Sequence, residues 1–194
     1  MRKFAILLLA TTVVFCMFGC SIENVIHSCY DFLEAEEIEQ NYVIYTLKND
    51  QYGYHLLVDG EIFYCETTEN YPEINMIYDN ILEIRVGYGT GTSVAKYCNI
   101  KEKVVSSWYD DVVFYYEHLI FRLEYDKNKT GGNKHSLVVS NMFTGECKQT
   151  IFFEDISDEP MPINQIQVID NSVEIEYFTI DGSTKKKLVA LATN

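Results

Sequence analysis

The sequence lacks the short motifs that mark the commonest catalytic and metal-binding sites. It contains no CxxC, HExxH or GxSxG pattern, which removes the sequence evidence for zinc ribbons, thioredoxin-type redox sites, zinc-dependent proteases and serine hydrolases. The four histidines are scattered, and no short spacing brings two imidazoles to one metal ion. We therefore expect neither a metal ion nor a cofactor.

Basic residues are also scarce. The chain has 15 lysine and arginine residues against 29 aspartate and glutamate residues, a formal net charge of -14. Such an excess of negative charge repels phosphate backbones and anionic lipid headgroups. The composition therefore argues against nucleic acid as a partner and leaves proteins and small molecules.

Long apolar runs are limited to one, close to the first residue. Phe4–Phe18 carries no charge, follows Arg2 and Lys3, and precedes Gly19 and Cys20. This is the layout of a secretory signal. A run of about fifteen residues is shorter than the roughly 20 that a permanent membrane-spanning helix requires. We expect a cleaved signal peptide over residues 1–20 rather than a retained transmembrane anchor.

The segment Met17–Cys20 resembles the lipobox of bacterial lipoproteins, in which a small residue precedes the lipid-carrying cysteine. Gly19 and Cys20 match that pattern, whereas Met17 and Phe18 are bulkier than the residues usual at their positions. The resemblance implies cleavage before Cys20, acylation of its sulfur, and attachment to the lipid bilayer at the extracytoplasmic face of the cell membrane. The alternative is an ordinary signal peptide with a chance cysteine.

Four cysteines remain if Cys20 carries lipid: Cys29, Cys65, Cys98 and Cys147. Disulfides are chemically permitted outside the cytoplasm, and four cysteines allow three complete pairings. The spacing does not resemble a compact disulfide framework of the small secreted kind. It selects none of the three pairings.

The remainder of the chain divides by composition. Residues 21–41 are acidic and lack strand alternation, and we expect an acidic tether with a short helix over Tyr30–Gln40. From Tyr42 onward, short aromatic and β-branched runs are separated by glycine, aspartate and asparagine, which is typical of all-β structure. The sequence therefore predicts one all-β domain over residues 42–194.

Alternation of apolar and charged residues marks three strands with one buried face. They are Leu82–Val86, Phe121–Tyr125 and Val173–Tyr177. Each is followed by a glycine-containing loop and a second strand, and an earlier, looser copy begins at Tyr42. These four hairpin units begin about 40 to 50 residues apart, and the last one is the shortest.

A repeat of about 40 residues built from antiparallel strands is typical of β-propeller blades. The sequence therefore predicts a small propeller-like fold, with a β-sandwich or barrel as the alternative. The second unit is also similar to part of uncharacterised lipoproteins from Gram-positive bacteria. In those proteins a GxGT-type hairpin precedes a tyrosine-rich strand and a Ser-x-Trp/Phe strand, here Gly89–Thr92, Tyr97 and Ser106–Trp108. That resemblance implies no activity.

The candidate binding residues surround the single tryptophan. Clustered tyrosines on a β surface form binding faces because tyrosine combines a large contact area with a polar tip. Two adjacent carboxylates add a charged edge to this cluster. The candidate residues are Trp108, Tyr109, Asp110, Asp111, Tyr115 and Tyr116.

Two functions fit this sequence. The first is a non-catalytic, lipid-anchored binding module whose partner is an envelope protein or a small ligand. The alternative is a cell-envelope carbohydrate hydrolase that uses paired carboxylates. A hydrolase requires a pocket in which two carboxylates converge, whereas a binding module requires a patch or groove without convergent ionisable groups. No residue is assigned a catalytic role.

Overall fold

A computed structural model describes residues 38–40, 42–48, 51–89, 92–126, 128 and 134–192. The predicted signal peptide and the predicted acylation site, Cys20, lie outside these residues, as does most of the predicted helix. Its last three residues, Ile38–Gln40, form strand β1 instead of helix. Within the described ranges, no helix is long and apolar enough to cross a membrane.

Contacts divide the chain into two compact units, Met1–Tyr71 and Pro72–Asn194, where the sequence predicted one β domain. The described part of the first unit is sheet A. It contains β1 (Ile38–Gln40), β2 (Val43–Lys48), β3 (Gln51–Val58) and β4 (Glu61–Thr68) in sequential antiparallel order. Asp59 and Gly60 form the turn between β3 and β4, with φ angles of 54° and 81°.

The second unit contains three sheets, which we name B, C and D. Sheet B contains β5 (Pro72–Tyr78), β6 (Ile81–Gly87), β7 (Ser93–Asn99) and β8 (Val104–Val105), and β9 (Tyr109–Asp110) also pairs with β7. Sheet C contains β10 (Val112–Tyr116), β11 (Leu119–Tyr125), β12 (His135–Asn141) and β13 (Cys147–Phe152). Sheet D contains β14 (Ile163–Ile169), β15 (Ser172–Phe178) and β16 (Thr184–Ala190).

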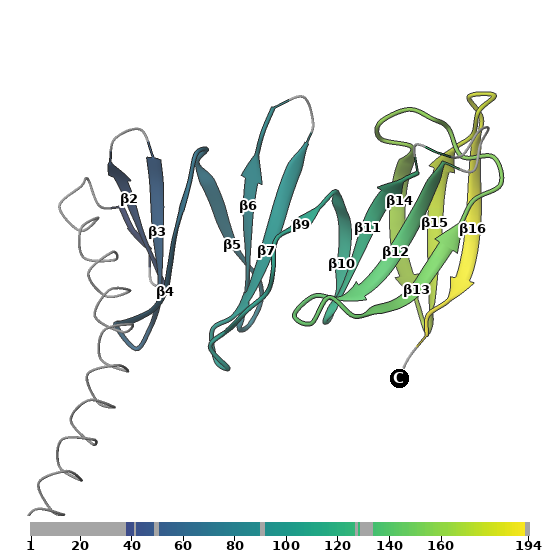
Figure 1. The fold of residues 1–194 in the computed structure, drawn as a ribbon. Coiled ribbons are helices and arrows are strands. Elements are labelled where there is room, and N and C mark those ends of the chain that lie inside the picture. Colours follow the sequence, from purple (N-terminus) through teal and green to yellow (C-terminus); the bar gives the residue numbers. More distant parts are fainter. Residues whose placement is uncertain are drawn as a thin grey trace, which may run out of the picture. The chain divides into compact units, whose positions relative to one another are not determined.

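Every sheet is an antiparallel meander whose strands follow one another in chain order, except that β9 pairs with β7 (Figure 1). The predicted all-β, propeller-like class is therefore confirmed. Its sheets have the strand connectivity of propeller blades, which are antiparallel meanders. For each sheet of the second unit, the predicted hairpin omitted the first strand. The omitted strands are β5, β10 and β14. The residues Ser106–Trp108, which the sequence comparison placed in a strand, lie between the two short strands β8 and β9.

Both faces of sheet C contribute side chains to a buried core, since consecutive residues of a strand point to opposite faces. Phe121 belongs to a core cluster with Val173 and Ile175 of sheet D. The preceding residue, Ile120, belongs to a second cluster with Tyr97 of sheet B. Sheet C therefore packs against sheet D on one face and against sheet B on the other.

The charged face of β6 is also buried, although the alternation predicted that it would face solvent. Glu83 is only 7% exposed. Its carboxylate accepts hydrogen bonds from Arg85 at 2.7 and 3.3 Å and from the Tyr97 hydroxyl at 3.1 Å. Burial, followed by the neighbouring Glu83 charge, raises the pKa of Tyr97. A charge can be buried here because its partners satisfy its hydrogen-bonding capacity.

The cysteines differ in state and exposure. Cys65 is disulfide-bonded, whereas Cys98 is a buried free thiol and Cys147 an exposed free thiol. Burial raises the pKa of Cys98 to about 12. Since the thiolate is the reactive form, almost none of the Cys98 side chain is available for reaction at pH 8.

We therefore expect iodoacetamide to alkylate Cys147 in the native protein and to alkylate Cys98 only after unfolding. Peptide mass spectrometry after brief labelling at pH 8, with and without denaturant, measures both sites. Cys147 is the internal control for reagent activity. Equal labelling of the two thiols in the native protein would contradict the buried position of Cys98.

Candidate functional site

A pocket of about 700 Å³ lies within the second unit. This volume falls in the range of roughly 300–1,000 Å³ that is typical of small-molecule sites. Its walls come from β6, the start of β7, β10, the ends of β11 and β12, and β14 with the loop that precedes it. The apolar part of the wall is formed by Val112, Val113, Leu123, Pro160, Met161, Ile163 and Ile166.

Two β-bulges border the pocket. In β10 the pairing with β11 shifts between Val112 and Phe114, which leaves Val113 as the extra residue. In β14 the pairing with β15 shifts between Ile163 and Gln165, so Asn164 is the extra residue. Both strands are sheet edges, and both extra residues line the pocket. Bulges redirect side chains at sheet edges and occur often beside functional sites.

The turn before β10 has an unusual backbone conformation. Asp111 lines the pocket with a φ angle of 50°, in the left-handed region that residues other than glycine seldom adopt. Its carbonyl oxygen accepts a hydrogen bond from the Leu123 amide at 3.0 Å. This bond helps to hold the turn in place, so that the side chain of Asp111 lies at the rim of the pocket.

His135 provides the buried polar group of the pocket. It is 5% exposed, and neither ring nitrogen makes a hydrogen bond of good geometry to a described residue. Its ring lies 4.9 Å from the ring of Tyr125, the residue opposite it in β11. Burial lowers the pKa of His135, and Asp158, through its charge and a backbone contact with the imidazole, only partly opposes this change. The imidazole is therefore neutral at pH 7, with one nitrogen able to donate and the other able to accept a hydrogen bond.

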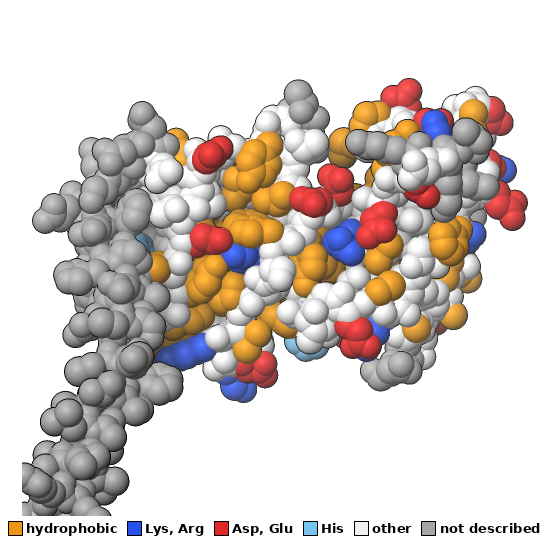
Figure 2. All heavy atoms as spheres, in the orientation of Figure 1, with side chains coloured by type: hydrophobic (Ala, Val, Ile, Leu, Met, Phe, Trp, Pro, Cys, Tyr) orange, Lys and Arg blue, Asp and Glu red, His pale blue; other side chains and the backbone are white. Residues whose placement is uncertain are grey.

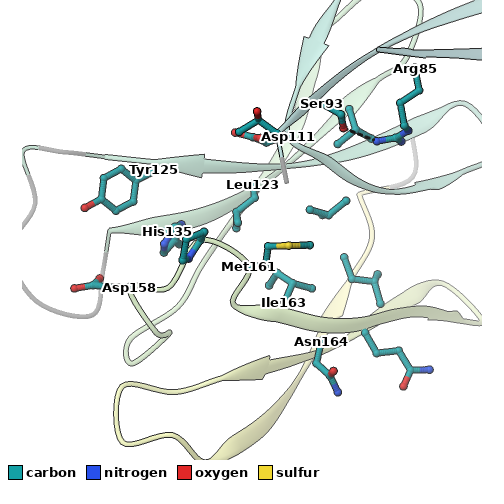
Figure 3. Close-up of a pocket in the computed structure, with 16 residues that line it drawn as sticks. Arg85, Ser93, Asp111, Leu123, Tyr125, His135, Asp158, Met161, Ile163 and Asn164 are labelled. Carbon is teal, nitrogen blue, oxygen red and sulfur yellow. Dashed lines mark hydrogen bonds between the residues drawn. The ribbon is translucent and has the colours of Figure 1, made fainter. Parts of the chain in front are cut away.

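The charged groups that line the pocket are largely paired. Arg85 binds Glu83 and also donates to the Ser93 hydroxyl at 3.0 Å. Asp158 accepts a hydrogen bond from Lys134 at 2.9 Å. Figure 3 shows His135 and Tyr125 at one end of the pocket and Arg85 and Ser93 at the other, with Met161 and Ile163 between them.

The predicted aromatic cluster does not form one exposed patch. Tyr109 is buried in the core cluster that Tyr115 packs against, whereas Tyr116 packs against the other core cluster. Tyr115 and Tyr116 are consecutive strand residues, so their side chains point to opposite faces. Trp108 is half-buried and lies under the ammonium group of Lys96, 4.6 Å from the ring centroid.

The two predicted carboxylates also separate. Asp110 is exposed in β9 and is not among the residues that line the pocket, whereas Asp111 lines it. The other carboxylate of the pocket, Asp158, comes from the acidic loop before β14, and Figure 3 shows that it does not point toward Asp111. Among the described residues, no group of three or more His, Cys, Asp or Glu side chains could hold a metal ion.

Sequence reasoning did not identify His135 as a site residue. One signal was available, because His135 lies two residues before Leu137 and four before Val139, both buried on the same face of β12. Extending the alternation of that strand by one residue places the histidine at the end of an apolar row. Tyr125, Arg85 and Met161 come from other strands and loops, and no local pattern brings them to His135.

Hydrophobic side chains also reach the surface of sheet B. Figure 2 shows hydrophobic side chains at the surface over β5 to β7, with charged side chains beside them. Tyr78 is one of the exposed aromatic residues of sheet B, but its hydroxyl accepts a hydrogen bond from the Glu117 amide and its ring contacts Tyr115. Its polar tip is thus already used within the unit.

Comparisons with known proteins place this chain in no family. No protein-family model matches it, and no curated protein matches it. Among solved structures it is similar to BamB from Moraxella catarrhalis, with 9% sequence identity and a TM-score of 0.27. The match covers 78% of this chain and 56% of the BamB chain, so this chain spans little more than half the length of that protein. A similarity this low supports no argument about fold or function.

Proposed function

We propose that this protein is a non-catalytic binding module, anchored by lipid at the extracytoplasmic face of a cell membrane, and that it holds a small ligand in the pocket of the second unit. The observation that carries the binding role is a largely apolar pocket that ends at one buried histidine, whose ring nitrogens make no hydrogen bond of good geometry to a described residue. Sites for small molecules combine apolar walls with a few polar groups that fix orientation.

The alternative, a carbohydrate hydrolase, has less support. Glycoside hydrolysis requires two carboxyl groups that flank one bond. Asp111 and Asp158 both line the pocket, but they do not point toward one another, and Lys134 already pairs with Asp158. The pocket therefore offers a binding surface rather than a pair of carboxylates arranged for catalysis.

Filling the pocket tests the binding role. Val113→Trp places an indole at the bulge of β10, and we expect it to abolish the binding of compounds found by ligand-observed NMR with a fragment library. The matched control is Val104→Trp, since Val104 is 41% exposed, Val113 is 40% exposed, and Val104 is not among the pocket residues. Fragments that bind both variants equally, or a library without any binder, would contradict the proposal.

The lipid anchor makes a separate prediction. Membrane fractionation and mass spectrometry of the first residues of the processed protein are expected to show an acylated Cys20 at the new N-terminus. Cys20→Ala is expected to abolish acylation and cleavage at this position, because the thioether requires the sulfur. Cleavage before Cys20 would remove Cys16 with residues 1–19, and the described Cys98 and Cys147 are free thiols. Cys29 is then the cysteine left to pair with Cys65, which is disulfide-bonded. The same digest is therefore expected to contain Cys29 linked to Cys65. An unmodified Cys20, or another first residue, would refute the anchor.

A further inference from the structure

The charges around the pocket set a requirement on its ligand. Within the described residues, the guanidinium of Arg85 is engaged by Glu83 and Ser93, and the ammonium of Lys134 is engaged by Asp158. The Asp111 carboxylate has no side-chain partner in the described part of the chain, and it lies at the rim. The wall thus presents no cation that is available for an anion, and it presents one uncompensated negative charge.

His135 sets a second requirement. A buried polar group without a partner costs free energy that a ligand recovers when it supplies the missing hydrogen bond. Since neither ring nitrogen makes a hydrogen bond of good geometry to a described residue, a neutral donor or acceptor on the ligand can satisfy one of them. The apolar side chains between the two ends of the pocket bury the remainder of such a molecule.

We propose that the ligand is a small amphipathic molecule without negative charge that places one neutral hydrogen-bonding group against His135 and an apolar body against Met161, Ile163 and Leu123. This inference rests on the proposed binding function and adds the chemical class of the ligand. It also makes His135 a specificity-determining residue, because an apolar side chain in its place leaves the polar group of the ligand without a partner.

Two fluorescent probes that share one ring system test the inferred chemical class of the ligand. N-phenyl-1-naphthylamine is neutral and has a single N–H donor, whereas 8-anilino-1-naphthalenesulfonate adds a permanent negative charge to the same ring system. We expect the neutral probe to bind the protein at least about tenfold more tightly, since the sulfonate meets the Asp111 charge and no available cation. Equal binding, or tighter binding of the sulfonate, would overturn the inference.

Three variants test whether the pocket causes the preference for the neutral probe. His135→Leu is expected to weaken the neutral probe about 3- to 10-fold, the value of one hydrogen bond. His118→Leu changes an exposed histidine outside the pocket and serves as the control. Asp158→Asn releases Lys134 from its ion pair, and it is expected to shift the ratio of the two affinities toward the sulfonate. A His135→Leu variant that behaves like His118→Leu, or a ratio that Asp158→Asn leaves unchanged, would overturn the assignment.

The outcomes for function and ligand class are separable. If fragments bind and Val113→Trp abolishes their binding, but the two probes bind equally, the pocket is a ligand site and the inferred ligand class is wrong. If neither fragments nor probes bind, the proposed function itself fails.

Discussion

Replacing Phe121 with alanine is expected to lower the free energy of unfolding by about 3–5 kcal/mol. Phe121 is fully buried, and its ring contacts Phe114 at 5.3 Å in an edge-to-face arrangement. It belongs to the core cluster between sheets C and D. The substitution removes the apolar transfer energy of a large ring and leaves a cavity in a closely packed interior.

Sheet C supplies a matched control. Phe152 is 59% exposed in β13, and Phe152→Ala is expected to cost less than about 1 kcal/mol. Urea denaturation followed by the fluorescence of Trp108, the single tryptophan, measures both variants in the second unit. Equal losses in the two variants would contradict the packing of sheet C against sheet D.

Arg85→Met is expected to cost about 2–4 kcal/mol, because it leaves the buried Glu83 carboxylate without its cationic partner. The Tyr97 hydroxyl remains bonded to that carboxylate and keeps the loss below that of a fully isolated charge. Adding Glu83→Gln to Arg85→Met removes the unpaired charge. The double variant is therefore expected to be more stable than Arg85→Met alone.

An exposed ion pair provides the comparison for the Arg85 and Glu83 variants. Lys148 and Glu146 are 2.9 Å apart, and the Glu146 side chain is 64% exposed. Lys148→Met is therefore expected to cost no more than about 1 kcal/mol. Urea midpoints for the four proteins measure the difference. If Arg85→Met were no more destabilising than Lys148→Met, Glu83 would not be a buried charge that depends on Arg85.

The strands that could be predicted are those with an uninterrupted alternation. Leu82–Val86, Phe121–Tyr125 and Val173–Tyr177 all lie within observed strands, because a regular pleat places every second residue on one face. The first strands of sheets C and D escaped prediction for a physical reason. Val113 and Asn164 are bulge residues, and one extra residue shifts the alternation along the strand.

The candidate site was less accessible to prediction. Alternation places His135 on the buried face of β12, but it does not reveal that the loop with Met161 and the edge of β14 enclose it. Arg85 and His135 are 50 residues apart in the sequence, and only the packing of the sheets brings both to the pocket. The predicted aromatic residues around Trp108 do not gather in one patch, because residues that are neighbours in the sequence point to different core clusters.

A crystal structure of the protein grown with N-phenyl-1-naphthylamine tests the central claim most directly, which is that the pocket of the second unit binds a small ligand without negative charge. We expect the naphthylamine in this pocket, with its N–H directed at a ring nitrogen of His135 and its rings against Met161 and Ile163. A structure in which the probe occupies another surface while this pocket contains only water would contradict the claim.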